Sequence, residues 1–159
     1  MMDGVNDNGE ATMEKAATDI YTFENLRKNG YTYIDKTAIL KHLADDSRGR
    51  QFFIARPRRF GKSLAVSTLQ CLFEGRRDLF QGLAIEQEWD WSKKWPVIRL
   101  DMGNMQYETV EMLSVAVRDY LGKEAGHLGV TIDMSLPAQE VFRNLIHAVA
   151  ATAADRHRR

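Results

Sequence analysis

The chain has 159 residues, of which 44% are apolar and 28% charged, and its net charge is zero. This composition is typical of a globular protein of about one domain, and the balanced charge argues against a wholesale nucleic-acid or membrane-surface binder. The single cysteine, Cys71, excludes an intrachain disulfide and favours a reducing, cytoplasmic location.

The N-terminal stretch is polar and acidic and has no apolar core of signal-peptide length. No other stretch reaches the roughly 18 apolar residues that cross a bilayer, so we expect no membrane partner. We divide the chain into a disordered polar tail over residues 1–18, a folded region over residues 19–154 and a basic C-terminal end over residues 155–159.

Local patterns predict alternating helices and apolar strands after the tail. Asp35 is placed to cap a helix over residues 36–44, and residues 51–55 (QFFIA) form a wholly apolar run that suits a buried parallel strand. A second helix is predicted over residues 64–74 and ends at Gly75. Residues 76–95 are predicted to form a connection that is held in place by bulky side chains. Residues 97–102 (VIRLDM) are predicted to form a second buried strand.

Two more helices are predicted in the last third of the chain. The first covers residues 107–123 and is ended by glycines at positions 122, 126 and 129, and the second begins near Pro137. The order of helices and strands favours the α/β class.

A phosphate-binding motif lies between the first predicted strand and the helix that follows it. Gly61, Lys62 and Ser63 match the end of G-x-x-x-x-G-K-[ST], but Arg56 stands where that motif has its first glycine. In such a loop, backbone N–H groups and a helix N-terminus hold the phosphates of a nucleotide. The lysine reaches the β- and γ-phosphates, and the Ser/Thr hydroxyl joins the Mg²⁺ shell. The pattern therefore predicts ATP and Mg²⁺ as cofactors, with Lys62 as the catalytic cation and Ser63 as the metal ligand.

Four motifs in this order resemble the predicted AAA-ATPase-like family of P-loop proteins over residues 20–150. They are YIDKT (33–37), FIARPRRFGKSL (53–64), LFQGLAI (79–85) and WPVIRLDM (95–102). The resemblance implies a P-loop NTPase-like parallel sheet with flanking helices, and arginine is the usual residue in that family at the position of Arg56. It also implies a nucleotide-binding site formed by Arg58, Arg59, Phe60, Gly61, Lys62, Ser63 and Leu64.

The role of the YIDKT segment stays open on sequence grounds. Its residues Tyr33, Asp35, Lys36 and Thr37 either border the nucleotide or anchor the N-terminal helix, and we favour anchoring.

Hydrolysis also requires an acidic site that holds Mg²⁺ at the end of another strand. Asp101 is the candidate, but no glutamate follows it, and we favour a residue that caps the end of the strand. The magnesium-binding strand of the family is expected beyond residue 154, so the chain reads as truncated before it. We therefore leave hydrolysis open and expect that a partner chain supplies the missing strands.

We predict no functional site at the tryptophans, the histidines or Cys71. Trp89, Trp91 and Trp95 suit packing better than base stacking, and the four histidines lack metal-ligand spacing with Cys71. Two alternatives to ATP binding remain. One is a nucleic-acid-binding module that uses the eight basic residues between Arg48 and Arg77. The other is an inactive remnant or partner of a separately encoded ATPase half.

Overall fold

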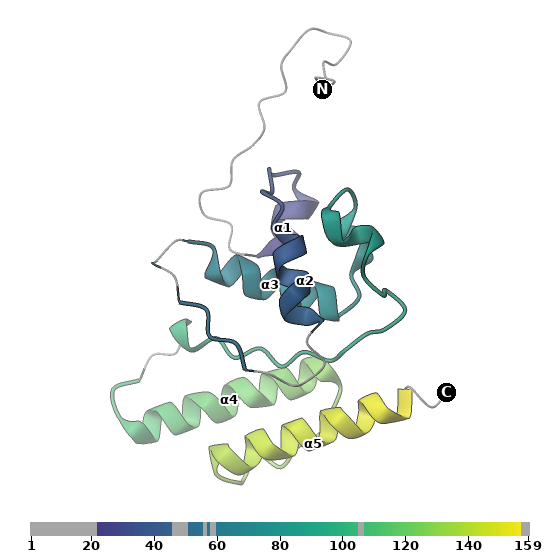
Figure 1. Cartoon of the computed structure of the whole chain (residues 1–159). Helices are drawn as coiled ribbons and strands as arrows, with labels where there is room; N and C mark the ends of the chain where they lie inside the picture. Colours follow the sequence, from purple (N-terminus) through teal and green to yellow (C-terminus); the bar gives the residue numbers. More distant parts are fainter. Residues whose placement is uncertain (1–21, 46–50, 56, 58–59, 105–106, 157–159) are drawn as a thin grey trace, which may run out of the picture. The chain divides into compact units, whose positions relative to one another are not determined.

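A computed structural model describes residues 22–45, 51–55, 57, 60–104 and 107–156 (Figure 1). The predicted tail over residues 1–18 lies outside this part. The described α-helices are α1 (Phe23–Lys28), α2 (Thr37–Ala44), α3 (Lys62–Phe73), α4 (Val110–Leu128) and α5 (Ala138–Arg156). Three short 3₁₀ helices join them, η1 (Arg77–Phe80), η2 (Ala84–Gln87) and η3 (Met102–Asn104).

The chain forms two compact units, Met1–Lys94 and Trp95–Arg159. The first unit contains α1, α2, α3, η1 and η2. Its core is a cluster of buried side chains to which α1, α3 and the segment 79–85 all contribute, and the aromatic rings of Phe23 and Phe80 lie 4.8 Å apart within it. The buried members are Phe23, Cys71, Leu72, Leu79, Phe80, Leu83 and Ile85.

The connection after α3 is part of this core, as its bulky side chains predict. α3 ends at Phe73, and Gly75, just beyond the C-cap Glu74, adopts a φ of 72°, which only glycine takes readily. Leu79, Phe80 and Ile85 then bury their side chains. Trp89 and Trp91 pack against the same cluster, which confirms packing as their use. Trp95 belongs to the other unit and is 44% exposed.

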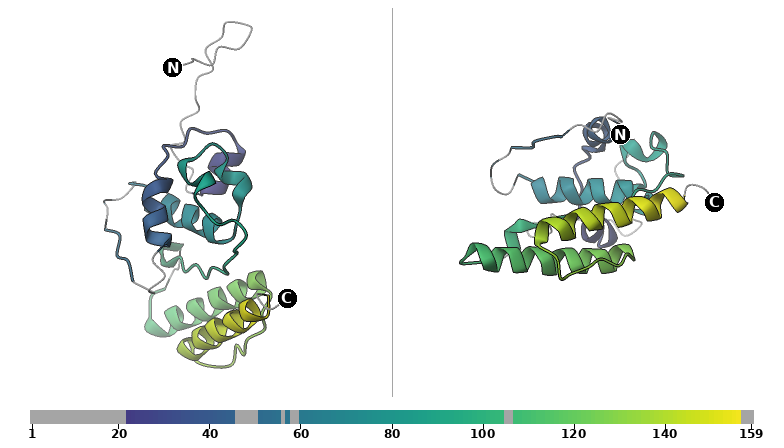
Figure 2. Two further views of the ribbon diagram at one scale, coloured as in Figure 1. Left: turned by 45° about the vertical axis from the view of Figure 1, so that its right-hand side comes forward. Right: turned by 90° about the horizontal axis from the view of Figure 1, so that it is seen from below.

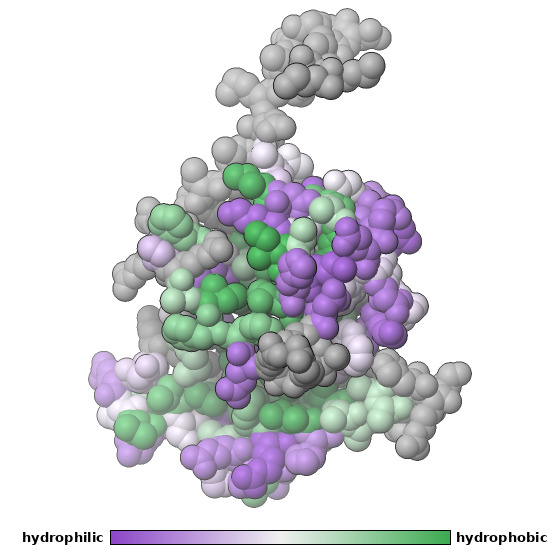
Figure 3. Space-filling model, in the orientation of Figure 1, coloured by the Kyte–Doolittle hydropathy of each residue, from purple (hydrophilic) through white to green (hydrophobic). Residues whose placement is uncertain are grey.

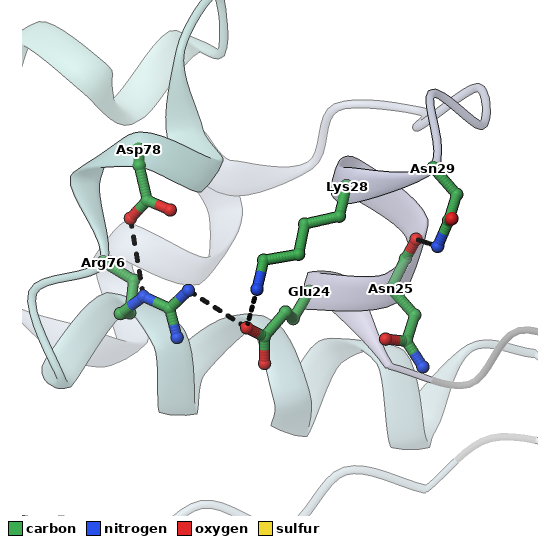
Figure 4. A network of polar contacts seen from close by, with 6 residues as sticks. All are labelled: Glu24, Asn25, Lys28, Asn29, Arg76 and Asp78. Atoms are coloured by element: carbon green, nitrogen blue, oxygen red, sulfur yellow. Dashed lines mark hydrogen bonds and ion pairs between the residues drawn. The ribbon is translucent and has the colours of Figure 1, made fainter.

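Ion pairs fasten α1 to the segment that follows α3 (Figure 4). The Glu24 carboxylate lies 2.7 Å from the Lys28 amine and 3.0 Å from the Arg76 guanidinium, which also contacts Asp78. The hydrogen bonds from Lys28 and then Arg76 lower the pKa of Glu24. These groups are partly exposed, so we expect the network to add little stability.

The second unit is a helical hairpin in which α4 and α5 lie side by side (Figures 1 and 2). Ile98, from the segment before α4, packs against its core. Four fully or nearly fully buried residues from the two helices lie at the centre: Leu121, Ala125, Val141 and Leu145.

The predicted parallel sheet is wrong for the described residues, which form no strand beyond the single bridge residue Tyr31. Residues 51–55 and 97–101 carry no secondary structure, and residues 51–55 are exposed instead of buried. A continuous apolar run indicates a tendency to be buried, but a strand also needs a neighbour that binds its backbone N–H and C=O groups. No described segment takes that place, so the α/β assignment is replaced by a helical architecture.

The predicted helices are confirmed, with corrected ends. The helix predicted over residues 107–123 begins later, at Val110, and continues through Gly122 and Gly126 to Leu128. It ends at Gly129, which has a φ of 70°. Thus only the last of the three glycines acts as a terminator, because it is the one that takes the left-handed conformation. In the described part of the chain, no helix is long and apolar enough to cross a membrane.

Candidate functional site

The predicted phosphate loop turns into α3 at Gly61. This residue caps the helix with φ 73° and ψ 20°, and its carbonyl accepts the first helical hydrogen bond, from the Ala65 N–H at 2.9 Å. A Cβ added to Gly61 would meet no atom within 4 Å, so the requirement for glycine comes from the backbone and not from crowding. The backbone N–H groups of the first turn of α3 lie immediately after this residue.

The side chain of Lys62 folds back onto the loop. Its Nζ donates a hydrogen bond of 2.9 Å to the carbonyl of Pro57, five residues earlier. The contact places a cation over the loop at the N-terminal end of α3, where the helix dipole also favours an anion. An oxygen of a bound anion can replace the Pro57 carbonyl as acceptor, since both are hydrogen-bond acceptors for an ammonium group.

The other predicted site residues divide into three groups. Ser63 and Phe60 are exposed, whereas Leu64 is partly buried and packs against the core of the first unit. Arg58 and Arg59 lie outside the described residues, as does Arg56. Binding by any of the seven predicted residues therefore stays a prediction, and the described geometry concerns Phe60, Gly61, Lys62, Ser63 and Leu64.

Two buried hydroxyls hold the middle of α3 in place. Ser67 Oγ accepts a hydrogen bond of 3.0 Å from the Phe23 N–H at the start of α1. Thr68 Oγ1 donates to the Leu64 carbonyl at 2.8 Å and its side chain also bonds with Tyr33. Burial raises the pKa of Tyr33, and the bond with Thr68 only partly opposes this effect. The helix that carries Lys62 at its start is thus fixed to the N-terminal segment through Ser67 and Thr68, five and six residues after Lys62.

Asp35 and Thr37 join the start of α2 to η2. Asp35 Oδ1 accepts from the Thr37 N–H and hydroxyl at 2.8 and 2.7 Å, and Oδ2 accepts from the Ala84 N–H at 2.7 Å. Thr37 is fully buried and its Oγ1 accepts from the Ile85 N–H at 3.3 Å. Lost hydration alone would raise the pKa of Asp35, but the bonds from Ala84 and Thr37 outweigh it and hold that pKa below its ordinary value.

These contacts support anchoring as the role of the YIDKT segment, because its carboxylate and threonine hydroxyl are bonded to α2 and η2. Sequence reasoning left this role open. The pairing with residues 84–85 was not predicted, although both segments belong to the motifs quoted for the family.

Comparison with known proteins gives the family. The model of the family described as "Predicted AAA-ATPase" matches residues 17–157, which is most of the chain. The chain belongs to this AAA-ATPase-like family.

A relative from Azotobacter chroococcum mcd 1, described as an uncharacterized protein in the vnfD 5' region, is 36% identical to this AAA-ATPase-like chain over 118 residues. The match covers 74% of the chain but 22% of the relative, so the chain spans about a fifth of that protein's length. No solved structure matches the chain.

Asp101, the acidic candidate for the magnesium site of this AAA-ATPase-like chain, is engaged in its own turn. Its Oδ1 accepts from the Gly103 N–H at 3.0 Å, and its Oδ2 lies 3.6 Å from the Arg99 guanidinium. The carboxylate thus caps a turn, but it is not the strand-end cap that we favoured, because no strand precedes it in the described residues. Both carboxylate oxygens are thus engaged by neighbouring groups, and the arrangement adds no support for a magnesium site.

The described histidine, cysteine and acidic side chains form no metal site. Within the described ranges, no group of three or more His, Cys, Asp or Glu side chains is arranged to hold a metal ion. Cys71 is buried in the core of the first unit, and burial raises its pKa to about 11. Its thiol is therefore protonated at neutral pH and serves as a small core side chain.

Proposed function

We propose that the chain binds the phosphates of ATP, together with Mg²⁺, at the loop that precedes α3. The observation that carries the proposal is the position of the Lys62 amine, which lies back over the loop at 2.9 Å from the Pro57 carbonyl. Gly61 supports it, because it takes the left-handed backbone conformation in which the chain enters α3. Membership of a predicted AAA-ATPase family supports ATP as the nucleotide.

Each residue of the proposed site has a distinct role. Lys62 supplies the cation for the β- and γ-phosphates, and the exposed Ser63 supplies a hydroxyl for Mg²⁺. Arg58 and Arg59 add positive charge. Phe60 and Leu64 flank Gly61, Lys62 and Ser63 in the sequence, and the Phe60 side chain is exposed whereas the Leu64 side chain contacts the core. Bound Mg²⁺ would neutralise phosphate charge.

The nucleic-acid alternative gains no support from the described basic residues. Arg76 pairs with Glu24 and Asp78, and Arg77 lies 3.9 Å from Glu86. These pairs neutralise part of the basic stretch, while five of its eight residues lie outside the described part. We therefore carry ATP binding forward and expect nucleic-acid retention to be weak even at low salt.

The proposal is tested by titrating a fluorescent ATP analogue with Mg²⁺ against the wild type, Lys62→Ala and Lys123→Ala. Lys123 is an exposed lysine of α4 and serves as the matched control. Loss of a charged hydrogen bond of about 1.5–3 kcal/mol predicts roughly ten- to hundredfold weaker binding for Lys62→Ala. Equal affinities for all three proteins would overturn the proposal. Phosphate release in the same samples would show whether binding leads to hydrolysis.

A further inference from the structure

Three polar side chains are buried in the first unit, in contrast to the hydrophilic residues that Figure 3 shows on one face of the molecule. Thr37, Ser67 and Thr68 are 0%, 4% and 1% exposed, and in the described part of the chain they are the buried polar residues. A buried hydroxyl is costly unless it is hydrogen-bonded. The partners of these three hydroxyls therefore indicate which elements they hold together.

Two of these side chains are the first buried positions of α3. Residues 62–66 of that helix are exposed or partly buried, whereas Ser67 and Thr68 are enclosed. The turns of an α-helix are closed by backbone hydrogen bonds, so a helix moves largely as a rigid body over so short a distance. The placement of Lys62 and Ser63 at the start of α3 therefore depends on what holds Ser67 and Thr68.

Both hydroxyls bind the N-terminal segment, by which we mean residues 23–37. Ser67 Oγ accepts from the backbone N–H of Phe23 at 3.0 Å, across 44 residues of sequence. The Thr68 side chain bonds with the Tyr33 side chain. The rings of Phe23 and Tyr33 also pack against each other, with centroids 5.1 Å apart. The two attachment points of α3 therefore belong to one packed group.

The N-terminal segment is itself held at its other end. Asp35 Oδ2 accepts from the Ala84 N–H, and the buried Thr37 hydroxyl accepts from the Ile85 N–H in η2. Hydrogen bonds thus join the segment to α3 at one end and to η2 at the other. A segment that is fixed to η2 can hold α3 in place and does not simply follow its movements.

We propose that Ser67 and Thr68 are positioning residues of the nucleotide site. They hold the start of α3 in the orientation in which Lys62 and Ser63 meet the phosphates, and they couple occupancy of the site to the N-terminal segment. The inference rests on the proposed function. Because coupling between two sites is reciprocal, bonds that raise the affinity for nucleotide are themselves strengthened when nucleotide is bound. A purely structural pair of bonds would leave the affinity of the folded chain unchanged.

The first experiment measures the affinity of Thr68→Val and Thr68→Ser for the ATP analogue with Mg²⁺. Valine has the shape of threonine without its hydroxyl, whereas serine keeps the hydroxyl. We expect about fivefold weaker binding by folded Thr68→Val and recovery to within about twofold of the wild type in Thr68→Ser. Thr152→Val is the matched control and should bind as the wild type does. Thr152 Oγ1 donates to the carbonyl four residues earlier, as Thr68 Oγ1 does, but it lies in the second unit.

The outcomes separate this inference from the proposed function. Wild-type affinity in Thr68→Val, with the helical circular dichroism of the wild type, would overturn the positioning role. If Lys62→Ala binds weakly in that case, nucleotide binding at the loop still stands. Equal binding by Lys62→Ala and the wild type would remove both proposals.

Amide hydrogen exchange of the wild type gives an answer even where Thr68→Val does not fold. The Phe23 N–H reports directly on the bond to Ser67. The Leu83 N–H, which is bonded to the Phe80 carbonyl in its own turn, measures the general stabilisation of the first unit by the ligand. With saturating ATP analogue, exchange at Phe23 should slow by about tenfold more than exchange at Leu83. Equal slowing at the two positions would overturn the proposal.

Discussion

The carboxylate of Asp35 accepts a hydrogen bond of 2.7 Å from the backbone N–H of Ala84, 49 residues further along the chain. Asp35 is itself held by Thr37, whose buried hydroxyl accepts the neighbouring Ile85 N–H. These two bonds join the start of α2 to η2 within the first unit. Because Ile85 is buried in the core, we expect loss of this contact to lower the free energy of unfolding and not only to increase the local motion of η2.

Asp35→Ala should destabilise the chain by about 1–3 kcal/mol, because the Ala84 and Thr37 N–H groups lose their acceptor. Urea unfolding followed by circular dichroism measures the change. Asp133→Ala is the matched control, since Asp133 bonds only within its own turn, to Ser135, in the second unit. A loss for Asp35→Ala no larger than that for Asp133→Ala would show that the contact between α2 and η2 is not stabilising.

The contribution of Asp35 should disappear in acid. Its folded pKa lies below the ordinary value of 3.8, so the ionised form stabilises the fold above that pH and the contribution is lost as the pH falls through the folded pKa. The difference in melting temperature between the wild type and Asp35→Asn should therefore be largest near neutral pH and shrink below about pH 3.8. A difference that is constant from pH 7 to pH 3 would rule out a pKa shift at Asp35.

Cys71 should resist thiol reagents in the folded chain. Burial raises its pKa to about 11, so the thiolate that reacts is almost absent at pH 7.5 and is also inaccessible. We expect an Ellman titration to detect no thiol within minutes in buffer and one thiol per chain in 6 M guanidinium. Rapid labelling in buffer would mean that the core around α3 opens readily.

Two glycine substitutions should have opposite effects. Gly61→Ala forces alanine into φ 73° and should cost about 1 kcal/mol or more, together with weaker binding of the ATP analogue. Gly126→Ala has the same open space around the new Cβ but lies inside α4, where alanine should stabilise by about 0.5–1 kcal/mol. Thermal melts and the binding titration compare the two. Equal effects on stability would contradict the left-handed conformation at Gly61.

The helices could be predicted from sequence because their signals are local. The apolar spacing predicted α2, α3, α4 and α5, and Gly75 marked the end of α3 correctly. The ends of α4 were predicted less well, since only the backbone conformation separates Gly129 from Gly122 and Gly126. The GKS tripeptide placed the loop before α3, and the structure adds the contact between Lys62 and Pro57.

The sequence by itself determined α2 to α5, the family motifs and the position of the candidate phosphate loop, because each depends on residues a few positions apart. Only the tertiary structure decided that residues 51–55 are exposed and unpaired, and that Asp35 bonds to Ala84. A strand and a long-range hydrogen bond both require a partner that is distant in sequence. An apolar run shows that a segment tends to be buried, but where it is buried depends on which surface the rest of the fold presents to it.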